Sequence, residues 1–301
     1  LTFMRLLQQL SRLLDDPPPE FIFEISEMGI SAARRSAPGE TSFQPLEPDV
    51  LSVSPLRDNV LRPEVFAQRV QAMVPPAQGR KRRRAVLILP DYCARLTVLD
   101  FDSFPSDPAE QASLIRFRVK RSVPFDVDSA AVSFHVQQAE GKGKKLEVVV
   151  AVAALEIIAR YEAPFRAAGL HPGLVTVSAL SALSLIPSTE SAVVAKLGGK
   201  VLTVAVVDRG LVKLIRCVEL AELTPAEVFD ILQPTVAYME DELGRRPDRV
   251  FLCGFDSAEN QIGMQWQEGL DIPTEYLTSR FGTPGRNNAG LLGYLESAGG
   301  R

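Results

Sequence analysis

The chain has 301 residues, of which 46% are hydrophobic and 23% charged, and its formal net charge is −4 at pH 7. This composition is typical of a soluble globular protein with one large or two medium domains, and the charge is too small to indicate nucleic-acid binding. The three cysteines lie far apart, at 93, 217 and 253, which argues against a disulfide framework or a zinc site and fits a reducing cytosol. We expect neither a membrane-spanning helix nor a signal peptide.

The first predicted element is an amphipathic helix at residues 3–14, where one phenylalanine and five leucines share a face. Prolines at 17–19 end this helix and form a stiff spacer, so residues 1–19 are a segment of their own. Such a helix either docks on its own domain or lies on a membrane surface. In the second case, Leu6 and Leu10 are candidate membrane contacts.

Residues 20–90 predict a first lobe. Apolar runs bounded by turn residues indicate three short strands, then a helix that begins with proline, then a fourth strand. The strands cover residues 21–25, 30–35, 42–46 and 85–89, and the helix begins at Pro63.

A dense basic run, GRKRRR at residues 79–84, precedes the fourth strand. No aromatic side chains alternate with its cations, so it does not indicate nucleic-acid binding. The run is either a solvated loop or a contact with anionic lipid, for which Arg82 is the candidate residue.

Residues 91–153 predict an inserted module of strands and one helix. Its strands cover residues 95–101, 130–137 and 145–152, and its helix covers residues 108–123. The helix has an apolar stripe, formed by Ala112, Ile115 and Val119, and a cationic side, formed by Arg116, Arg118, Lys120 and Arg121. Pro124 ends the helix.

Residues 154–270 predict a second lobe, and about 270–301 would complete the first. After a helix and a short strand, a second three-strand meander covers residues 191–197, 200–207 and 210–219, with a Gly198-Gly199 hairpin turn. A helix opened by a Thr224…Glu227 capping box follows, and then a strand at 249–253. Three strands, a helix and a strand therefore occur twice, which is the layout of actin-like proteins with two lobes.

One segment resembles a known family. The strand ending in Leu89-Pro90, the cationic helix and the Val123-Pro124-Phe125-Asp126 sequence are similar to PilM-type type IV pilus assembly proteins, which are relatives of FtsA and of GspL cytoplasmic domains. The later segment FRAAGLHPGLV also fits. The resemblance implies an α/β, actin-like (ribonuclease H-like) duplicated two-lobed fold with an FtsA-type inserted strand-helix-strand module.

The family implies a cytoplasmic scaffold, peripheral at the inner membrane, of the assembly platform of a type IV pilus or related secretion system. Its expected partner is a PilN-like bitopic membrane protein, whose N-terminal cytoplasmic peptide it would bind, together with other platform or motor proteins. In this sequence we expect the peptide near Leu114, Arg118 and Phe125.

The family also implies a nucleotide site, whose glycine turns bring backbone N–H groups to phosphate oxygens. The first turn aligns with Glu24-Ile25-Ser26 and has lost its glycine. The second aligns with Asp208-Arg209-Gly210, which is either a phosphate-binding turn, with Asp208 holding Mg²⁺ through water, or a hairpin turn after a buried strand. The adenosine motif aligns with Gly254-Phe255, where Phe255 takes space that a nucleotide needs. We therefore expect no cofactor and at most weak ATPase activity. The alternative is an actin-like ATP-binding protein or ATPase, with ATP and Mg²⁺, in which nucleotide controls partner binding.

Other chemistry has little support in the sequence. The only histidines are His135 and His171, and no GxSxG, P-loop, HExxH or Rossmann motif occurs. We expect no catalytic residues and no metal site.

Overall fold

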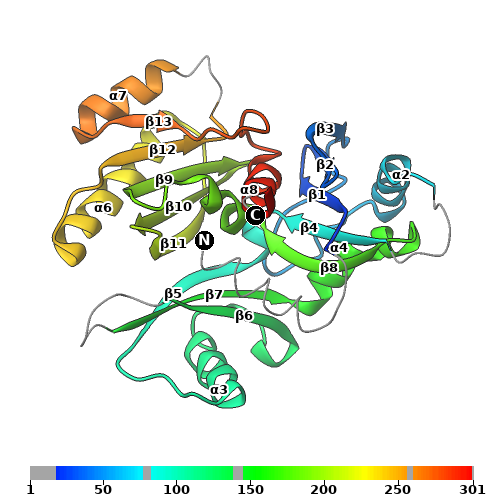
Figure 1. The fold of residues 1–301 in the computed structure, drawn as a ribbon, viewed down its shortest axis with the longest axis horizontal. Helices are drawn as coiled ribbons and strands as arrows, with labels where there is room; N and C mark the ends of the chain where they lie inside the picture. Colours follow the sequence, from blue (N-terminus) through cyan, green and yellow to red (C-terminus); the bar gives the residue numbers. More distant parts are fainter. Residues whose placement is uncertain (1–17, 77–82, 138–144, 256–259, 300–301) are drawn as a thin grey trace. The chain divides into compact units, whose positions relative to one another are not determined.

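The computed structural model describes residues 18–76, 83–137, 145–255 and 260–299. The chain divides into two compact units. Unit 1 comprises Leu1–Cys93, Glu156–Ile186 and Leu277–Arg301, and unit 2 comprises Ala94–Leu155 and Pro187–Tyr276. Most of the helices and strands of both units are labelled in Figure 1.

Unit 1 contains a five-stranded sheet of order β3-β2-β1-β4-β8. The strands are β1 (Phe21–Ser26), β2 (Gly29–Arg34), β3 (Ala37–Pro45), β4 (Arg84–Leu89) and β8 (His171–Val177). The first three form an antiparallel meander, whereas β4 and β8 run parallel to β1. The interior strand β4 is apolar from residue 85 to residue 89, as expected of a strand covered on both faces.

Side chains alternate along β1, so its apolar residues point to both faces of the sheet. Helices cover each of these faces. Phe23 points to α2 (Pro63–Met73) and α4 (Leu155–Ala167), and its ring centroid lies 4.9 Å from that of Phe165. Ile22 points the other way and packs on α8 (Ala289–Gly299), which also contacts α5 (Ser178–Ala182).

Unit 2 repeats this topology. Its sheet has the order β11-β10-β9-β12-β13, formed by β9 (Ser191–Gly198), β10 (Val201–Asp208), β11 (Leu211–Glu219), β12 (Arg249–Cys253) and β13 (Thr274–Tyr276). The helices that follow this meander in unit 2 are α6 (Pro225–Leu243) and α7 (Asn260–Leu270). Again three antiparallel strands are joined by two parallel ones. The predicted duplication is therefore present in the described chain.

The capping box predicted at the start of α6 is confirmed. Thr224 accepts a hydrogen bond from the Glu227 N–H at 3.2 Å. The Glu227 carboxylate accepts bonds from the N–H groups of Ala221, Glu222 and Leu223 at 2.6–3.1 Å, and these bonds hold the pKa of Glu227 below its ordinary value. Gly244, with a φ of 66°, ends the helix.

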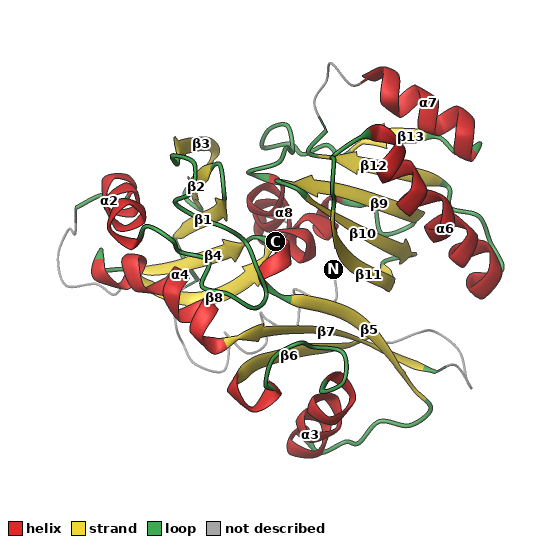
Figure 2. Cartoon of the chain, turned by 180° about the vertical axis from the view of Figure 1, so that it is seen from behind, coloured by secondary structure: helices red, strands yellow, loops and turns green. Residues whose placement is uncertain are grey.

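The inserted module is a three-stranded antiparallel sheet with one helix on one face (Figure 2). Its elements are β5 (Arg95–Phe101), α3 (Pro108–Val119), β6 (Ala130–Gln137) and β7 (Leu146–Ala154). Asp107 caps α3 by accepting from the N–H groups of Ala109 and Glu110. Three short 3₁₀ turns complete the structure, at Asp91–Cys93, Val127–Ser129 and Leu183–Leu185.

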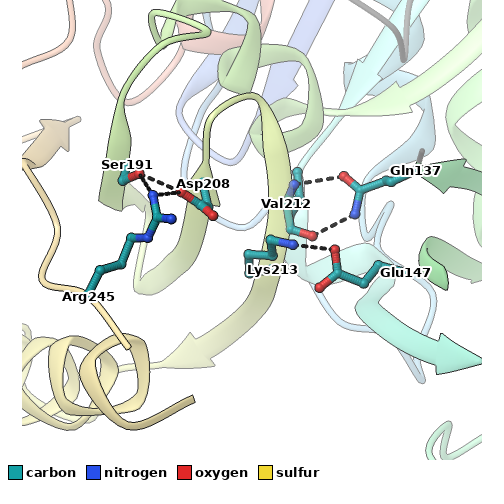
Figure 3. A network of polar contacts seen from close by, with 7 residues as sticks. All are labelled: Gln137, Glu147, Ser191, Asp208, Val212, Lys213 and Arg245. Carbon is teal, nitrogen blue, oxygen red and sulfur yellow. Dashed lines mark hydrogen bonds and ion pairs between the residues drawn. The ribbon is translucent and has the colours of Figure 1, made fainter. Parts of the chain in front are cut away.

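The module is attached to the second sheet within unit 2. The Gln137 side-chain amide donates to the Val212 carbonyl and accepts from the Val212 N–H, both at 2.7 Å (Figure 3). Next to it, Lys213 and Glu147 form an ion pair at 2.6 Å, with side chains only 12% and 17% exposed. A primary amide has the same donor and acceptor as a peptide group, so Gln137 satisfies backbone groups on the edge strand β11.

The unit boundaries differ from those expected. We predicted a second lobe from residue 154, but β8 pairs in parallel with β4, so residues 156–186 lie in unit 1. The module, expected as a separate domain at 91–153, belongs to unit 2 because of its contacts with β11. The C-terminal piece of unit 1 begins at Leu277 rather than near residue 270.

Two glycines allow α8 to approach α5 closely. A β-carbon added to Gly293 would lie 2.1 Å from the Ser181 carbonyl oxygen, and one added to Gly290 would lie 2.8 Å from the Ser178 Cα. Both obstacles are backbone atoms, so α8 would have to move to accept a side chain at either position.

We predict that Gly293→Ala lowers the free energy of unfolding of unit 1 by about 1–3 kcal/mol through overpacking, although alanine has the higher helix propensity. Chemical denaturation followed by circular dichroism measures this. Gly299→Ala, on the same helix, is the matched control because its new β-carbon comes close only to side-chain atoms, those of Arg280 and Phe281, and to no backbone atom. Equal stability of the two variants would contradict the prediction.

Candidate functional site

In unit 1, the turn between β1 and β2 is closed by its own polar groups. The Ser26 hydroxyl accepts from the Gly29 N–H at 3.2 Å and donates to the Gly29 carbonyl at 3.0 Å. The Glu27 carboxylate accepts from the Val53 N–H at 2.8 Å. Gly29 is required because a β-carbon there would collide with the Phe43 ring. Ser26 thus has a structural role in this turn.

Glu24 lies inside unit 1, with only 1% of its surface exposed. Its carboxylate accepts a hydrogen bond from the Leu291 N–H at 2.7 Å and another from the Ser178 hydroxyl. Leu291 is in the first turn of α8, where backbone N–H groups have no partner within the helix. The carboxylate therefore occupies the positive end of that helix, where an anion is stabilised.

A second carboxylate, which we did not predict, lies at the same edge of the sheet. Asp91 directly follows the segment Leu89-Pro90 at the end of β4, and its side chain accepts from the Ala179 N–H at 2.6 Å. Ala179 is in the first turn of α5. An acid immediately after a buried parallel strand was the available signal. Glu24 and Asp91 thus each bind the start of a helix.

In unit 2, the strand order shows that the turn equivalent to the β1–β2 turn is the one between β9 and β10. We expected it at Asp208-Arg209-Gly210, between β10 and β11. The last β1–β2 pair is Ser26 with Gly29, and the corresponding β9–β10 pair is Gly198 with Val201. Counting two residues back, the counterpart of Glu24 is Lys196. This lysine is 4% exposed, and its amino group lies 3.7 Å from the β-carbon position of Gly198.

The expected grouping of Asp208 and Gly210 with Gly254 is wrong. Asp208 ends β10 and pairs with Ser191, the first residue of β9, roughly 20 Å along the strand from Gly198. Its carboxylate accepts from the Ser191 hydroxyl at 2.5 Å and forms an ion pair with Arg245 at 3.0 Å (Figure 3). Gly210, with a φ of 81°, is a turn residue between β10 and β11. The Asp-x-Gly pattern matched, but it follows the second strand of the meander instead of the first.

Gly254 lies at the same end of the sheet as the Gly198-Gly199 turn. It follows Cys253, which is in register with Lys196, and its φ is 80°. The ring of Phe255, for which we expect a place in the space needed by a nucleotide, packs against Trp266, with centroids 5.3 Å apart. The described edge of unit 2 thus brings together Lys196, the Gly198-Gly199 turn and Gly254.

The candidate peptide-binding residues all lie in the module. Leu114 and Phe125 are partly buried against its apolar core, which includes Ile115 and Val119. The Arg118 guanidinium lies 4.9 Å from the centre of the Phe101 ring, in a cation–π contact. The structure therefore brings the three residues into one compact element, where each also contributes to the packing.

The candidate membrane residues Leu6, Leu10 and Arg82 lie outside the described residues. Within the residues that the structure describes, no helix is long and apolar enough to cross a membrane. The same residues contain no group of three or more His, Cys, Asp or Glu side chains that could hold a metal ion.

Comparison with known proteins identifies the fold. No family model and no curated protein matches the sequence. Among solved structures, a chain of the "PilM-PilN type IV pilus biogenesis complex" superposes with a TM-score of 0.73 at 17% identity, covering 95% of this chain and 100% of that one.

Two further structures are similar over most of their length. A Bacteroides thetaiotaomicron protein described as having an actin-like ATPase fold matches with a TM-score of 0.54 at 11% identity, covering 91% of this chain and 94% of its own. The cytoplasmic domain of EpsL, an inner-membrane component of the Vibrio cholerae type II secretion system, matches at 0.50 and 13%, covering 93% and 95%. The chain thus has the actin-like fold, and the predicted resemblance to PilM in structure is confirmed.

Proposed function

We propose that this chain is a scaffold at the cytoplasmic side of the inner membrane, in the assembly platform of a type IV pilus or a related secretion system. It binds the N-terminal cytoplasmic peptide of a PilN-like bitopic partner and does so without nucleotide. The main support is the superposition on the whole length of a chain from the PilM–PilN complex, together with that on the EpsL cytoplasmic domain.

The proposal that the partner peptide binds without nucleotide is supported by the charged side chains at the strand ends of each sheet. In unit 1, Glu24 and Asp91 occupy the starts of α8 and α5, and a phosphate there would meet two carboxylates. In unit 2, the position equivalent to Glu24 carries Lys196, which has no oxygen to bind a Mg²⁺ ion or its water.

The module supports the peptide part of the proposal. The end of α3 is cationic, and Arg118 is held on Phe101 with its charge exposed to solvent. The apolar core beneath it fixes Leu114 and Phe125. Because these side chains are already held in place, the module would lose little conformational entropy when a peptide binds to it.

We predict that the cytoplasmic peptide of the partner binds the full chain in calorimetry, and that Arg118→Glu weakens this binding at least about tenfold by reversing one charge at the interface. Lys145→Glu is the matched control, since Lys145 is also exposed, is cationic and lies in the module. Absence of binding by the unmodified chain, or equal losses in the two variants, would refute the peptide site.

A nucleotide-binding function is the second candidate. It is favoured by one observation, the amino group of Lys196 beside the Gly198-Gly199 turn, because a lysine and backbone N–H groups in a glycine turn are both phosphate ligands.

We predict that Mg-ATP leaves the melting temperature unchanged. A ligand that binds only the folded state at about 100 times its Kd would add about 2.7 kcal/mol, which is a shift of several degrees. If such a shift occurs, is lost in Lys196→Ala and persists in Asp208→Ala, the chain binds nucleotide at the Gly198-Gly199 turn. The scaffold proposal would then lose its independence from nucleotide but keep its peptide site.

We also predict that Glu24→Ala destabilises unit 1 by about 1–3 kcal/mol, because the Leu291 N–H and the Ser178 hydroxyl lose a buried acceptor. Glu24→Gln, which keeps one acceptor oxygen, has a smaller effect. Glu40→Ala, on the exposed strand β3, serves as the control in the same urea titration. If Glu24→Ala is as stable as this control, the carboxylate has no structural role.

A further inference from the structure

The C-terminal end of α3 and the turn that follows it present an aromatic ring and two cations to solvent. Phe117 is 73% exposed, more than any other large hydrophobic side chain in the described residues. Lys120, the C-cap of α3, and Arg121, in the turn that follows it, come three and four residues after Phe117, so the ring and both cations lie at the same end of the helix. Both are exposed, and in the described part of the chain neither has an ion-pair partner.

The other two cations of this helix are used by the module itself. The Arg116 guanidinium donates to the Val127 carbonyl at 2.7 Å, and Arg118 lies over the Phe101 ring. Phe117, Lys120 and Arg121 make no comparable contact with the module, so its own folding does not explain them.

Helix electrostatics account for only part of this arrangement. Cations near the end of a helix are stabilised by its dipole, which would explain Lys120 and Arg121. It does not explain Phe117, because an exposed aromatic ring gains nothing from the dipole and remains hydrated.

The charge around the ring favours an anionic surface. Between Ser113 and Ser129 the chain carries four cationic and two acidic residues. The two acids are Asp126 and Asp128, and the Asp126 carboxylate accepts from the Asp128 N–H at 3.1 Å and from the Ser129 hydroxyl. The acids reduce the positive charge of this surface but do not reverse it.

We propose that Phe117, Lys120 and Arg121 form a contact with an anionic phospholipid bilayer. The ring enters the interface between head groups and acyl chains, and the two cations bind lipid phosphates. A bilayer accepts a single protruding ring without a matching pocket, whereas a protein partner must supply one. The contact deepens the proposed location at the inner membrane, on which it rests, and involves residues other than Leu114, Arg118 and Phe125.

The test is co-sedimentation of the full chain with vesicles of phosphatidylcholine, with and without phosphatidylglycerol. We expect binding only to the anionic vesicles, and a decrease in high salt because charges are screened. Phe117→Ser and the double variant Lys120→Glu/Arg121→Glu should each reduce binding by about tenfold or more. Lys145→Glu, with one reversed charge elsewhere in the module, should bind nearly as the unmodified chain does.

Three results would overturn the proposal. The first is no binding of the unmodified chain to anionic vesicles, which would leave an acidic protein as the occupant. The second is equal binding by the double variant and Lys145→Glu. The third is loss of all binding in Leu6→Glu/Leu10→Glu with no effect of the α3 variants, which would assign the contact to the N-terminal segment. Calorimetry with the partner peptide tests the scaffold separately, since Phe117→Ser should keep that binding.

Discussion

The hydrogen bond from the Leu291 N–H to Glu24 connects the last helix of the chain to its first strand, across 267 residues. The carboxylate is buried, so it must be bonded on several sides to be tolerated, and Ser178 at the start of α5 provides another donor. The close approach of α8 to α5, which requires Gly293, places these donors around one carboxylate. Unit 1 therefore depends on an acid at the position that aligns with the first phosphate-binding turn of the family that the sequence resembles.

The same position in unit 2 shows how the duplicated sheets have diverged. Strand order and register agree between the two, but the residue two places before the turn is Glu24 in one and Lys196 in the other. A carboxylate and an ammonium group differ by two charge units, so the two edges cannot attract the same ligand group. The fold has been kept while the electrostatics of one edge were reversed.

The sequence was sufficient for most of the strands, the α6 cap and the fold class, because hydrophobic periodicity and turn residues are local signals. The strand expected at residues 42–46 is longer, since β3 covers Ala37–Pro45. It was not sufficient for positions that depend on pairing between distant strands. Asp208 fits the Asp-x-Gly motif in sequence. Only the pairing of β9 with β10 shows that it lies at the end of the sheet opposite to the Gly198-Gly199 turn. Likewise, residues 156–186 belong to unit 1 because β8 pairs with β4, which no local pattern predicts.

The module is held on the second sheet by polar groups at the edge strand β11. Gln137 gives β11 the donor and acceptor of one further strand residue, and the Lys213–Glu147 ion pair lies beside it. A strand edge paired in this way is closed to other chains at Val212. Because the module is fixed to the second sheet through groups that are largely buried, α3 is held by a rigid support. The ligands that we propose for α3 would then be selected by the charge and the exposed ring at the end of that helix, and not by a change in the module's shape.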